Sequence, residues 1–361
     1  MSSSLRVLLV AGVFFAAGPS TAETVALKSA AAAKQRYFGA AIDSAFLVEP
    51  VYRELATSQF SSITPENAMK WRSVEPVRGA FDWTAADEVA AFAKSNGQKL
   101  RGHNLLWEGY LPSWLAGEHF APAAFKDLIE EHIAAEVSRY KGAVYAWDVI
   151  NEPFDDAGHW RAGLLHDTLG DDYVAIALRA ARAADPDAKL YINDAGIEGG
   201  GPKFGALYKL VMALKSSGAP IDGVGLQSHF IAGRVPLGLP AILANFAALD
   251  VDVAITELDL RVHLPATPES VAQQAAGYRF VVASCLAVTR CVGVTTWGIS
   301  DDHSWISRIP DYGDALLFDR RGDPKPAYAA VSAVLRSKKP PTLSGITRSR
   351  QKGDARRPAA R

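Results

Sequence analysis

Along the middle of the chain, short apolar runs rich in β-branched residues alternate with longer segments in which apolar positions recur every three or four residues. The short runs have the length and composition of strands, and the longer, Ala-rich segments have the period of amphipathic helices. Breakers such as Asn96-Gly97 and Asp185-Pro186 stand where such helices must end. The expected strands are 37–43, 60–65, 100–107, 144–151, 190–194, 223–229, 253–260 and 292–299, with helices between them such as 85–95, 123–139, 172–184 and 270–287.

Eight β-then-α units without a Gly-rich dinucleotide fingerprint predict an α/β fold, a single (β/α)₈ barrel of the TIM type. A doubly wound open sheet is the alternative, because a local pattern does not show whether a sheet closes. The chain has 361 residues, of which 49% are hydrophobic and 21% charged, so it can bury a large core. No Pro/Ser-rich linker interrupts it, so we expect one domain over residues 23–337.

The two ends of the chain differ from this middle part. Residues 1–22 have the features of a signal peptide: Arg6, an apolar stretch over 7–17 and the small residues Ser20-Thr21-Ala22, although a plain hydrophobic start is the alternative. The apolar stretch is too short to span a membrane. Residues 338–361 contain eight Lys or Arg and one Asp, which predicts a disordered basic tail or a merely solvated extension. We therefore expect a protein secreted to the periplasm or the medium after cleavage near Ala22.

Charge and cysteine content narrow the function classes. The net charge of −1 argues against a nucleic acid as the main partner. Cys285 and Cys291 are the two cysteines of the sequence, and in an exported protein such a pair indicates a short-loop disulfide, with two buried free thiols as the alternative. Neither histidines nor further cysteines stand at ligand spacing around them, so we expect no metal ion and no other cofactor.

Polar groups follow seven of the eight expected strands, and in a barrel these ends converge on one mouth. Two apolar runs deliver carboxylates there, Glu152 after 144–151 and Glu257 within 253–260. Two carboxylates facing one cleft are the minimum apparatus for breaking a glycosidic bond. For either glutamate alone, a structural salt bridge would be an equally good interpretation.

The neighbours of the two glutamates predict different roles. Glu257 and Asp259 are two residues apart on one strand and share a face, as do Gln227 and His229 on the adjacent strand. We expect Asp259 to hold His229, and His229 to hydrogen-bond Glu257 and favour the ionised carboxylate that a nucleophile needs. Glu152, set among tryptophan and apolar neighbours, is expected to keep a proton for the leaving oxygen.

Other polar and aromatic residues near these strand ends suit a sugar substrate. Glu66, Asn67 and Lys70 stand where sugar hydroxyls need donors and acceptors, although Pro65-Glu66 also suits the start of a helix. Trp297 and Trp305 are expected to wall the cleft, with core packing as the alternative. Five other histidines are expected to be ordinary surface residues; they are His119, His132, His159, His166 and His263.

Together these motifs strongly resemble glycoside hydrolase family 10, the secreted endo-β-1,4-xylanases, over about residues 30–337. The resemblance implies a (β/α)₈ barrel, a retaining double displacement on xylan or xylo-oligosaccharides, and a monomer. Glu152 would be the acid/base and Glu257 the nucleophile, with Asn151 on the 2-hydroxyl of the reacting sugar and His229 and Asp259 tuning Glu257. A short-loop disulfide before the last strand also occurs in that family, which supports the Cys285–Cys291 pair. The glycone side would be lined by Glu66, Asn67, Lys70, His103, Trp107, Gln227, Trp297 and Trp305.

Two segments depart from the family pattern. After Trp107 the family usually continues His-Ser-Gln, whereas this chain has Glu108-Gly109-Tyr110 and lacks the glutamine that contacts the second glycone sugar. We expect Tyr110 to stack or block there, and Glu108 to add negative charge beside the same subsite. After Asn193-Asp194 the family usually has Tyr-Asn, and Ala195-Gly196 here removes an aglycone stacking platform.

Three alternatives remain open at this point. Another retaining glycosidase of the same barrel type, acting on cellulose, mannan or an unusual xylan, would share both glutamates. A non-catalytic polysaccharide-binding barrel would be expected to lack one of them. A metal-dependent barrel hydrolase would need a His-x-His pair after the first strand, where Ala40-Ala41-Ile42-Asp43 stands.

Overall fold

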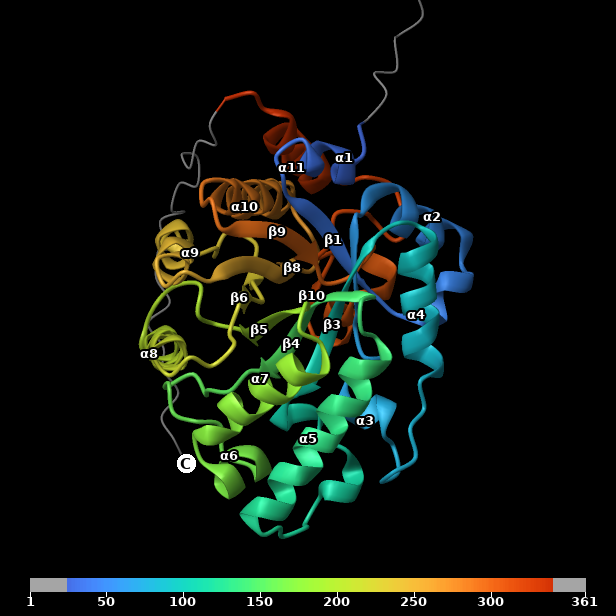
Figure 1. The fold of residues 1–361 in the computed structure, drawn as a ribbon. Coiled ribbons are helices and arrows are strands. Elements are labelled where there is room, and N and C mark those ends of the chain that lie inside the picture. Colours follow the sequence, from blue (N-terminus) through green and yellow to red (C-terminus); the bar gives the residue numbers. More distant parts are fainter. Residues whose placement is uncertain (1–24, 340–361) are drawn as a thin grey trace, which may run out of the picture.

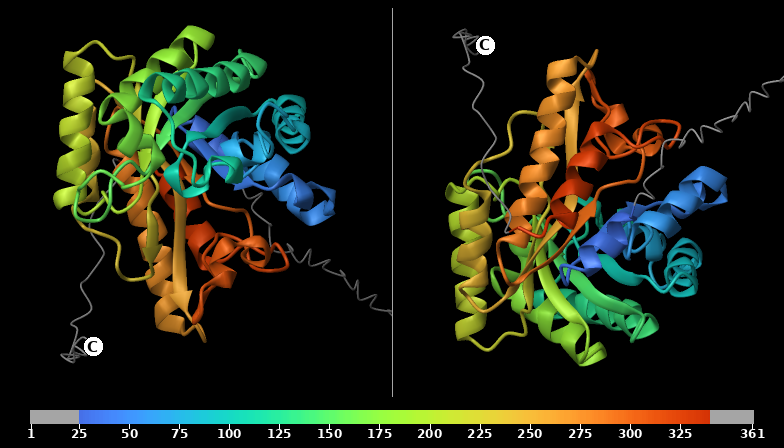
Figure 2. Two further views of the ribbon diagram at one scale, coloured as in Figure 1. Left: turned by 90° about the horizontal axis from the view of Figure 1, so that it is seen from below. Right: turned by 90° about the horizontal axis from the view of Figure 1, so that it is seen from above.

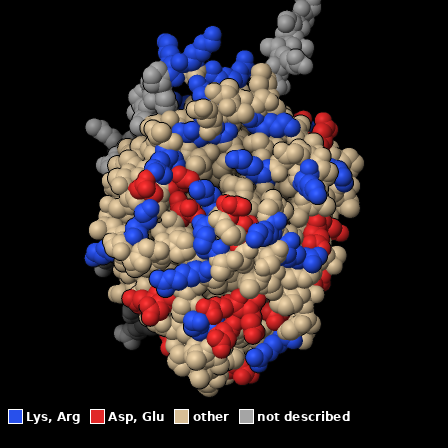
Figure 3. Space-filling view, in the orientation of Figure 1, with Lys and Arg blue, Asp and Glu red and all other residues tan. Residues whose placement is uncertain are grey.

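The computed structural model describes residues 25–339. The predicted signal peptide, residues 1–22, and the predicted basic tail beyond Lys339 lie outside the described residues. Among the residues that are described, no helix is long and apolar enough to cross a membrane. Side chains of both charges are interspersed over the face shown in Figure 3, so this face presents no extended surface of one sign.

Eight parallel strands close into a barrel, which confirms the predicted (β/α)₈ architecture and rules out the open sheet (Figure 1). Each strand pairs with the next around the barrel, and the last pairs with both its predecessor and β1, as in Phe38 opposite Val294. Figure 2 shows the strands enclosed by helices. The barrel strands are β1 (Tyr37–Ile42), β2 (Ser62–Pro65), β3 (Lys99–Leu106), β4 (Val144–Asn151), β5 (Lys189–Asp194), β6 (Gly223–Leu226), β8 (Asp252–His263) and β9 (Cys291–Thr296).

One predicted strand, 223–229, is divided in the structure. β6 ends at Leu226, and β7 (His229–Ile231) then pairs with the outer part of β8, opposite Asp259. Ser228 between them has a φ of 68°, a left-handed conformation that a continuous strand cannot contain. On its other side the long β8 also pairs with β10 (Tyr312–Gly313). β8 thus extends beyond the barrel and carries Glu257 and Asp259 into the mouth.

Helices follow the strands, and several begin at a proline, which fits a first helical turn because its missing N–H would be unpaired there anyway. Thr267 caps the helix that begins at Pro268, and its side chain accepts a hydrogen bond from the Ser270 N–H in a capping box. The helices are α1 (Leu27–Ala32), α2 (Pro50–Gln59), α3 (Trp71–Val74), α4 (Thr84–Ser95), α5 (Pro122–Arg139), α6 (Leu164–Leu169), α7 (Asp172–Ala184), α8 (Pro202–Ser216), α9 (Leu239–Ala247), α10 (Pro268–Leu286) and α11 (Pro326–Arg336).

Cys285 near the end of α10 and Cys291 at the start of β9 are joined by a disulfide bond. The predicted pairing is therefore present, and the alternative of two free thiols is excluded. Both residues are buried, so the bond ties the last helix–strand connection together inside the core.

The expectation that His132 is a surface residue is wrong. His132 lies on the inner face of α5, buried, with its ring stacked 4.2 Å from that of Trp71 and its Nε2 3.1 Å from the Leu105 carbonyl oxygen. Burial lowers the pKa of His132 to about 3, so the imidazole is neutral. Its spacing from Phe125 and Ile129, seven and three residues earlier, places all three on one helical stripe, and this period was the signal for burial.

Candidate active site

A cleft opens at the carboxyl ends of the barrel strands and collects nearly all the predicted site residues. Asp259 does not line the cleft, but it contacts His229, which does. The predicted residues along the cleft are Glu66, Asn67, Lys70, His103, Trp107, Asn151, Glu152, Gln227, His229, Glu257, Trp297 and Trp305.

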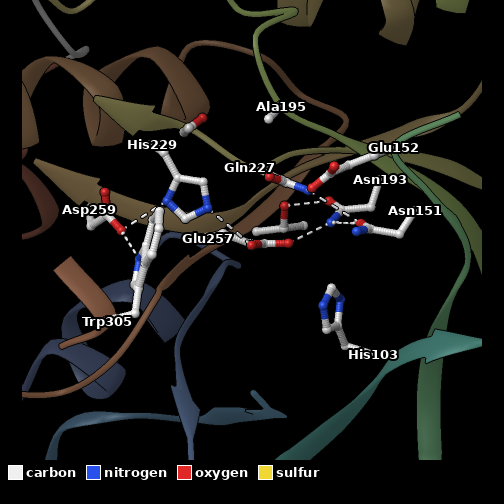
Figure 4. A network of polar contacts seen from close by, with 12 residues as sticks. His103, Asn151, Glu152, Asn193, Ala195, Gln227, His229, Glu257, Asp259 and Trp305 are labelled. Atoms are coloured by element: carbon white, nitrogen blue, oxygen red, sulfur yellow. Dashed lines mark hydrogen bonds and ion pairs between the residues drawn. The ribbon is translucent and has the colours of Figure 1, made fainter. Parts of the chain in front are cut away.

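Glu257, on β8, is buried and receives one donor on each carboxylate oxygen (Figure 4). Asn193 Nδ2 donates to Oε1 at 2.7 Å, and His229 Nε2 lies 3.1 Å from Oε2. Burial by itself would raise the pKa of Glu257, but the hydrogen bond from His229 and the proximity of His103 outweigh it and hold that pKa below its ordinary value. An ionised, fixed carboxylate in this position is suited to nucleophilic attack.

His229 connects Glu257 to Asp259, as the sequence predicts. Its Nδ1 lies 2.8 Å from Asp259 Oδ2, and Trp305 Nε1 donates to the same oxygen at 2.8 Å. The pairing of β7 with β8 sets His229 opposite Asp259 and so fixes the ring between the two carboxylates. Burial opposes the charged imidazolium, but Asp259 and Glu257 outweigh it and raise the pKa of His229 to about 10.

This arrangement makes a prediction for the titration of His229. In ¹⁵N NMR of labelled histidine, the imidazole should stay protonated through pH 8, and Asp259→Asn should lower its pKa by at least about one unit, because the main negative charge that stabilises the imidazolium is lost. Since the folded pKa lies above the ordinary value of 6.5, protonation stabilises the fold fully below about pH 6.5 and less as pH rises towards about 10. A wild-type imidazole that deprotonates near pH 6.5 would contradict the assignment.

Glu152 follows β4 and has a φ of 52°, while its N–H donates to the Asn193 carbonyl oxygen at 2.9 Å. Gln227 Nε2 donates to Oε1 at 3.1 Å, and Arg161 Nη2 donates to Oε2 at 3.2 Å. The surroundings of this carboxyl are thus polar, and the expectation of tryptophan and apolar neighbours is wrong. Sequence reasoning missed Arg161, because nothing in the local pattern shows that the loop after β4 turns back on itself.

Asn193, at the end of β5, ties the two glutamates together. Its Nδ2 donates to Asn151 Oδ1 at 2.9 Å as well as to Glu257, and its own Oδ1 accepts from Thr256 Oγ1 at 2.6 Å. Gln227 Nε2 lies 3.3 Å from Asn151 Oδ1, so this oxygen accepts from two side chains. The Nδ2 of Asn151, which lines the cleft, is left as the group that can donate to a sugar hydroxyl.

On the side of β2, Glu66, Asn67 and Lys70 precede α3 and line the cleft, so they do not form its first turn. Lys70 Nζ donates to Asn67 Oδ1 at 2.9 Å and lies 4.9 Å from the centre of the Trp107 ring. Burial lowers the pKa of Lys70, although the surrounding glutamates oppose this. Burial and then Asp43 raise the pKa of Glu66 to about 7. A buried cation beside an easily protonated carboxyl supplies both donors and acceptors for hydroxyls.

The segment after Trp107 places its two unusual residues in different surroundings. Tyr110 lines the cleft, with its ring parallel to that of Trp107 at 6.0 Å and Lys70 Nζ 5.0 Å from its centre. Glu108 points elsewhere, and the expectation that it charges the same subsite is wrong. Its two oxygens accept the N–H groups of Leu164 and Leu165, 3.0 Å away in each case, at the start of α6. Backbone donors at a helix start thus hold this carboxylate outside the cleft.

Aromatic rings bound the cleft near the nucleophile. Trp297 packs edge-on against His103, whose ring centre is 5.0 Å away, and Trp305 packs against His229 at 5.2 Å. His103 Nδ1 in turn lies 3.0 Å from a carboxylate oxygen of Asp148, which is paired with Arg101 inside the barrel. The tryptophans therefore both line the cleft and restrain its histidines. On the opposite side of Glu152, Ala195 lines the cleft and offers no ring.

Comparison with known proteins identifies the family of this barrel. The model of the family described as glycosyl hydrolase family 10 matches residues 26–334. The chain belongs to this family. The predicted family and fold are confirmed.

Curated relatives and solved structures agree with this assignment. Endo-1,4-beta-xylanase A of Phanerodontia chrysosporium is 47% identical over 319 residues, covering 87% of this chain and 78% of the relative. Native xylanase 10B from Thermotoga maritima superimposes with a TM-score of 0.84 at 34% identity, covering 86% of this chain and 98% of that one. A glycosylated family 10 endo-beta-1,4-xylanase from Gloeophyllum trabeum gives 0.83 at 41% identity, covering 87% and 100%.

Proposed function

We propose that this enzyme is a secreted endo-1,4-β-xylanase in which Glu257 is the nucleophile and Glu152 the acid/base. The observation that carries the proposal is the asymmetry of the two carboxylates in one cleft. Glu257 is held ionised by His229 and Asn193, whereas Glu152 is more exposed and follows β4, which β5 and β6 separate from the β8 of Glu257. The substrate class is supported by the relatives named endo-1,4-beta-xylanase and by a Thermotoga petrophila xylanase solved in complex with xylobiose.

In the first step, the Glu257 carboxylate attacks the anomeric carbon while Glu152 gives its proton to the departing glycosidic oxygen. The C–O bond of the substrate breaks and a glycosyl ester on Glu257 forms. In the second step, the Glu152 carboxylate takes a proton from water, whose oxygen attacks the same carbon and releases Glu257. The two inversions together retain the anomeric configuration. Asn151 Nδ2 is placed to donate to the 2-hydroxyl of the reacting sugar.

Hydrolysis of a panel of polysaccharides tests the proposal. Linear xylan and glucuronoxylan should release short xylo-oligosaccharides, and proton NMR should show the β-anomer first. Comparable rates on cellulose or mannan would favour another retaining glycosidase of the same barrel type. Binding to xylan without any hydrolysis would favour a non-catalytic barrel, and the α-anomer appearing first would exclude the double displacement.

Tyr110 provides a prediction on glycone specificity. A glutamine at this position can offer a sugar both a donor and an acceptor, each typically worth about 0.5–1.5 kcal/mol, whereas the tyrosine has one hydroxyl and a ring. Tyr110→Gln should therefore raise kcat/KM on xylotriose and xylotetraose about ten-fold. Tyr110→Phe, which keeps the ring beside Trp107, is the matched control and should change kcat/KM less. A fall in the Gln variant would mean that the ring itself recognises the sugar, and no change would mean that position 110 does not contact it.

Secretion and a monomeric state belong to the same proposal. The signal-peptide features of residues 1–22 support export, and a relative such as the endo-1,4-beta-xylanase of Agaricus bisporus, 43% identical over 302 residues, supports the activity. N-terminal sequencing of exported protein should find the mature chain starting just after Ala22, and light scattering should give the mass of one chain. A chain that retains Arg6 after export would contradict cleavage at this site.

A further inference from the structure

The loop after Glu152 turns back on itself and returns an arginine to the acid/base. Phe154 and Trp160 form an antiparallel bridge, and Asp155 Oδ1 accepts the N–H groups of Ala157 and His159 at 2.9 Å each. These contacts close a tight turn within the loop. Arg161, nine residues after Glu152, is thereby brought back beside it, and its N–H donates to the Pro153 carbonyl oxygen at 2.8 Å.

The Arg161 side chain contacts Glu152 at two points. Nε donates to the Glu152 carbonyl oxygen at 3.0 Å, and Nη2 donates to the carboxylate Oε2 at 3.2 Å. Nη2 also reaches the Phe154 carbonyl oxygen at 3.4 Å. Glu152 has the left-handed φ of 52°, which a residue with a side chain keeps only where its surroundings enforce it. One guanidinium therefore restrains both the backbone and the reacting group of the same residue.

The segment that carries Arg161 is also fixed from outside the loop. Glu108 accepts the N–H groups of Leu164 and Leu165, only three and four residues further on. Gly163 packs so closely on this carboxylate that an added Cβ would lie 2.2 Å from Glu108 Cδ. Glu108 thus anchors the end of the loop to the segment after β3.

We propose that Arg161 is a positioning residue for Glu152, which aims the carboxylate and favours the anionic form used in the second step. The inference rests on the proposed function, because it assumes that Glu152 is the acid/base. A guanidinium donating to a carboxylate stabilises its charge, and this pair is partly exposed, with side chains 36% and 20% accessible.

The other charges around Glu152 explain why Arg161 should matter more in the second step, hydrolysis of the glycosyl-enzyme, than in the first. Lys70 on the β2 side favours the anion, as Arg161 does, whereas Glu257 on β8 opposes it. Asp194 at the end of β5 also opposes the anion, although Asp194 forms an ion pair with Lys203, whose Nζ lies 2.8 Å from Asp194 Oδ1. When Glu257 becomes a neutral ester, its repulsion disappears. Arg161 and Lys70 then remain as the cations near the carboxylate that takes a proton from water.

The test compares Arg161→Met with Arg161→Lys on two substrates. 2,4-Dinitrophenyl β-xylobioside needs little proton donation, so breakdown of the glycosyl-enzyme should limit kcat on it. There Arg161→Met should lower kcat about ten-fold and leave kcat/KM within about two-fold. On xylotetraose, the alkaline limb of the pH profile of kcat/KM should move to higher pH in Arg161→Met, because Glu152 loses a neighbouring cation and keeps its proton to higher pH. Arg161→Lys should keep the wild-type limb, since the cation remains, and recover part of kcat.

Two control variants establish whether the effect of Arg161 is exerted through Glu152. Arg139→Met removes an arginine that also pairs with a carboxylate, Asp87, on the outer surface, and should change neither kcat nor the pH profile. Arg161→Met in a Glu152→Ala background should cause no further loss of kcat on the dinitrophenyl substrate. If Arg161→Met does not fold, Arg161→Gln takes its place with the same expectations.

Distinct results overturn the inference and the proposed function. Equal losses of kcat and kcat/KM on both substrates, with an unmoved pH profile, would make Arg161 merely structural. A further loss in the Glu152→Ala background would place its action elsewhere. If Glu152→Ala itself shows no dependence on the leaving group, the proposed function of Glu152 fails, whatever Arg161 does.

Discussion

Glu257→Ala is expected to reduce turnover of xylan by roughly 10⁴-fold or more, because no other group can form the glycosyl ester. Among the cleft residues, Glu257 is the carboxylate that receives both a charged imidazole and an amide donor, so its charge is fixed where the anomeric carbon must arrive. The measurement is kcat on xylotetraose, with circular dichroism to show that the variant is folded. Peptide mass spectrometry of the wild type labelled with a slow fluorinated xyloside should find the sugar on Glu257.

The control for this prediction is Asp259→Asn, which leaves Glu257 in place and weakens the contacts of Asp259 with His229 and Trp305. Its loss of kcat should be smaller, because the nucleophile remains. A Glu257→Ala variant with residual turnover comparable to that of Asp259→Asn would contradict the assignment. So would a label found on another carboxylate.

The sequence predicted most of the barrel because buried strands and amphipathic helices leave different periods in the chain. β4, expected at 144–151, has the same bounds in the structure, as does α7 at 172–184. The two glutamates and the His229–Asp259 contact followed from strand ends and from the two-residue period of a strand. These features depend on local pattern and on one general rule of barrels, that strand ends converge.

What the sequence did not predict depends on contacts between segments that no local pattern links. The return of Arg161 to Glu152 requires the turn at Asp155 and the hydrogen bonds of Glu108 to the start of α6. Neither contact leaves a periodic pattern of apolar residues in the sequence. For the same reason the local sequence does not show that Glu108 lies away from the sugar subsite, since its partner is the backbone of α6, 56 residues away. His132 is a different case, because its helical spacing from Ile129 indicates burial, against the general preference of histidine for surfaces.

Glu152→Ala is expected to lower kcat/KM on xylan about 10²–10⁴-fold, and to lower it far less on 2,4-dinitrophenyl β-xylobioside. The alkoxide that leaves from xylan is a poor leaving group and needs the proton that Glu152 gives, whereas dinitrophenolate departs without one. The second step still lacks its base, so the glycosyl-enzyme should accumulate, and kcat and KM on the aryl substrate should fall together with a burst of phenolate.

Gln227→Ala is the matched control: it removes a donor to the same carboxylate at 3.1 Å but keeps the acid, so its losses should depend little on the leaving group. Equal losses on both substrates in Glu152→Ala would remove the acid role. This test is decisive because the groups next to Glu152 cannot replace it as an acid. Arg161 and Gln227 donate hydrogen bonds to its carboxylate, but neither gives the leaving oxygen a proton at neutral pH as readily as a carboxylic acid does.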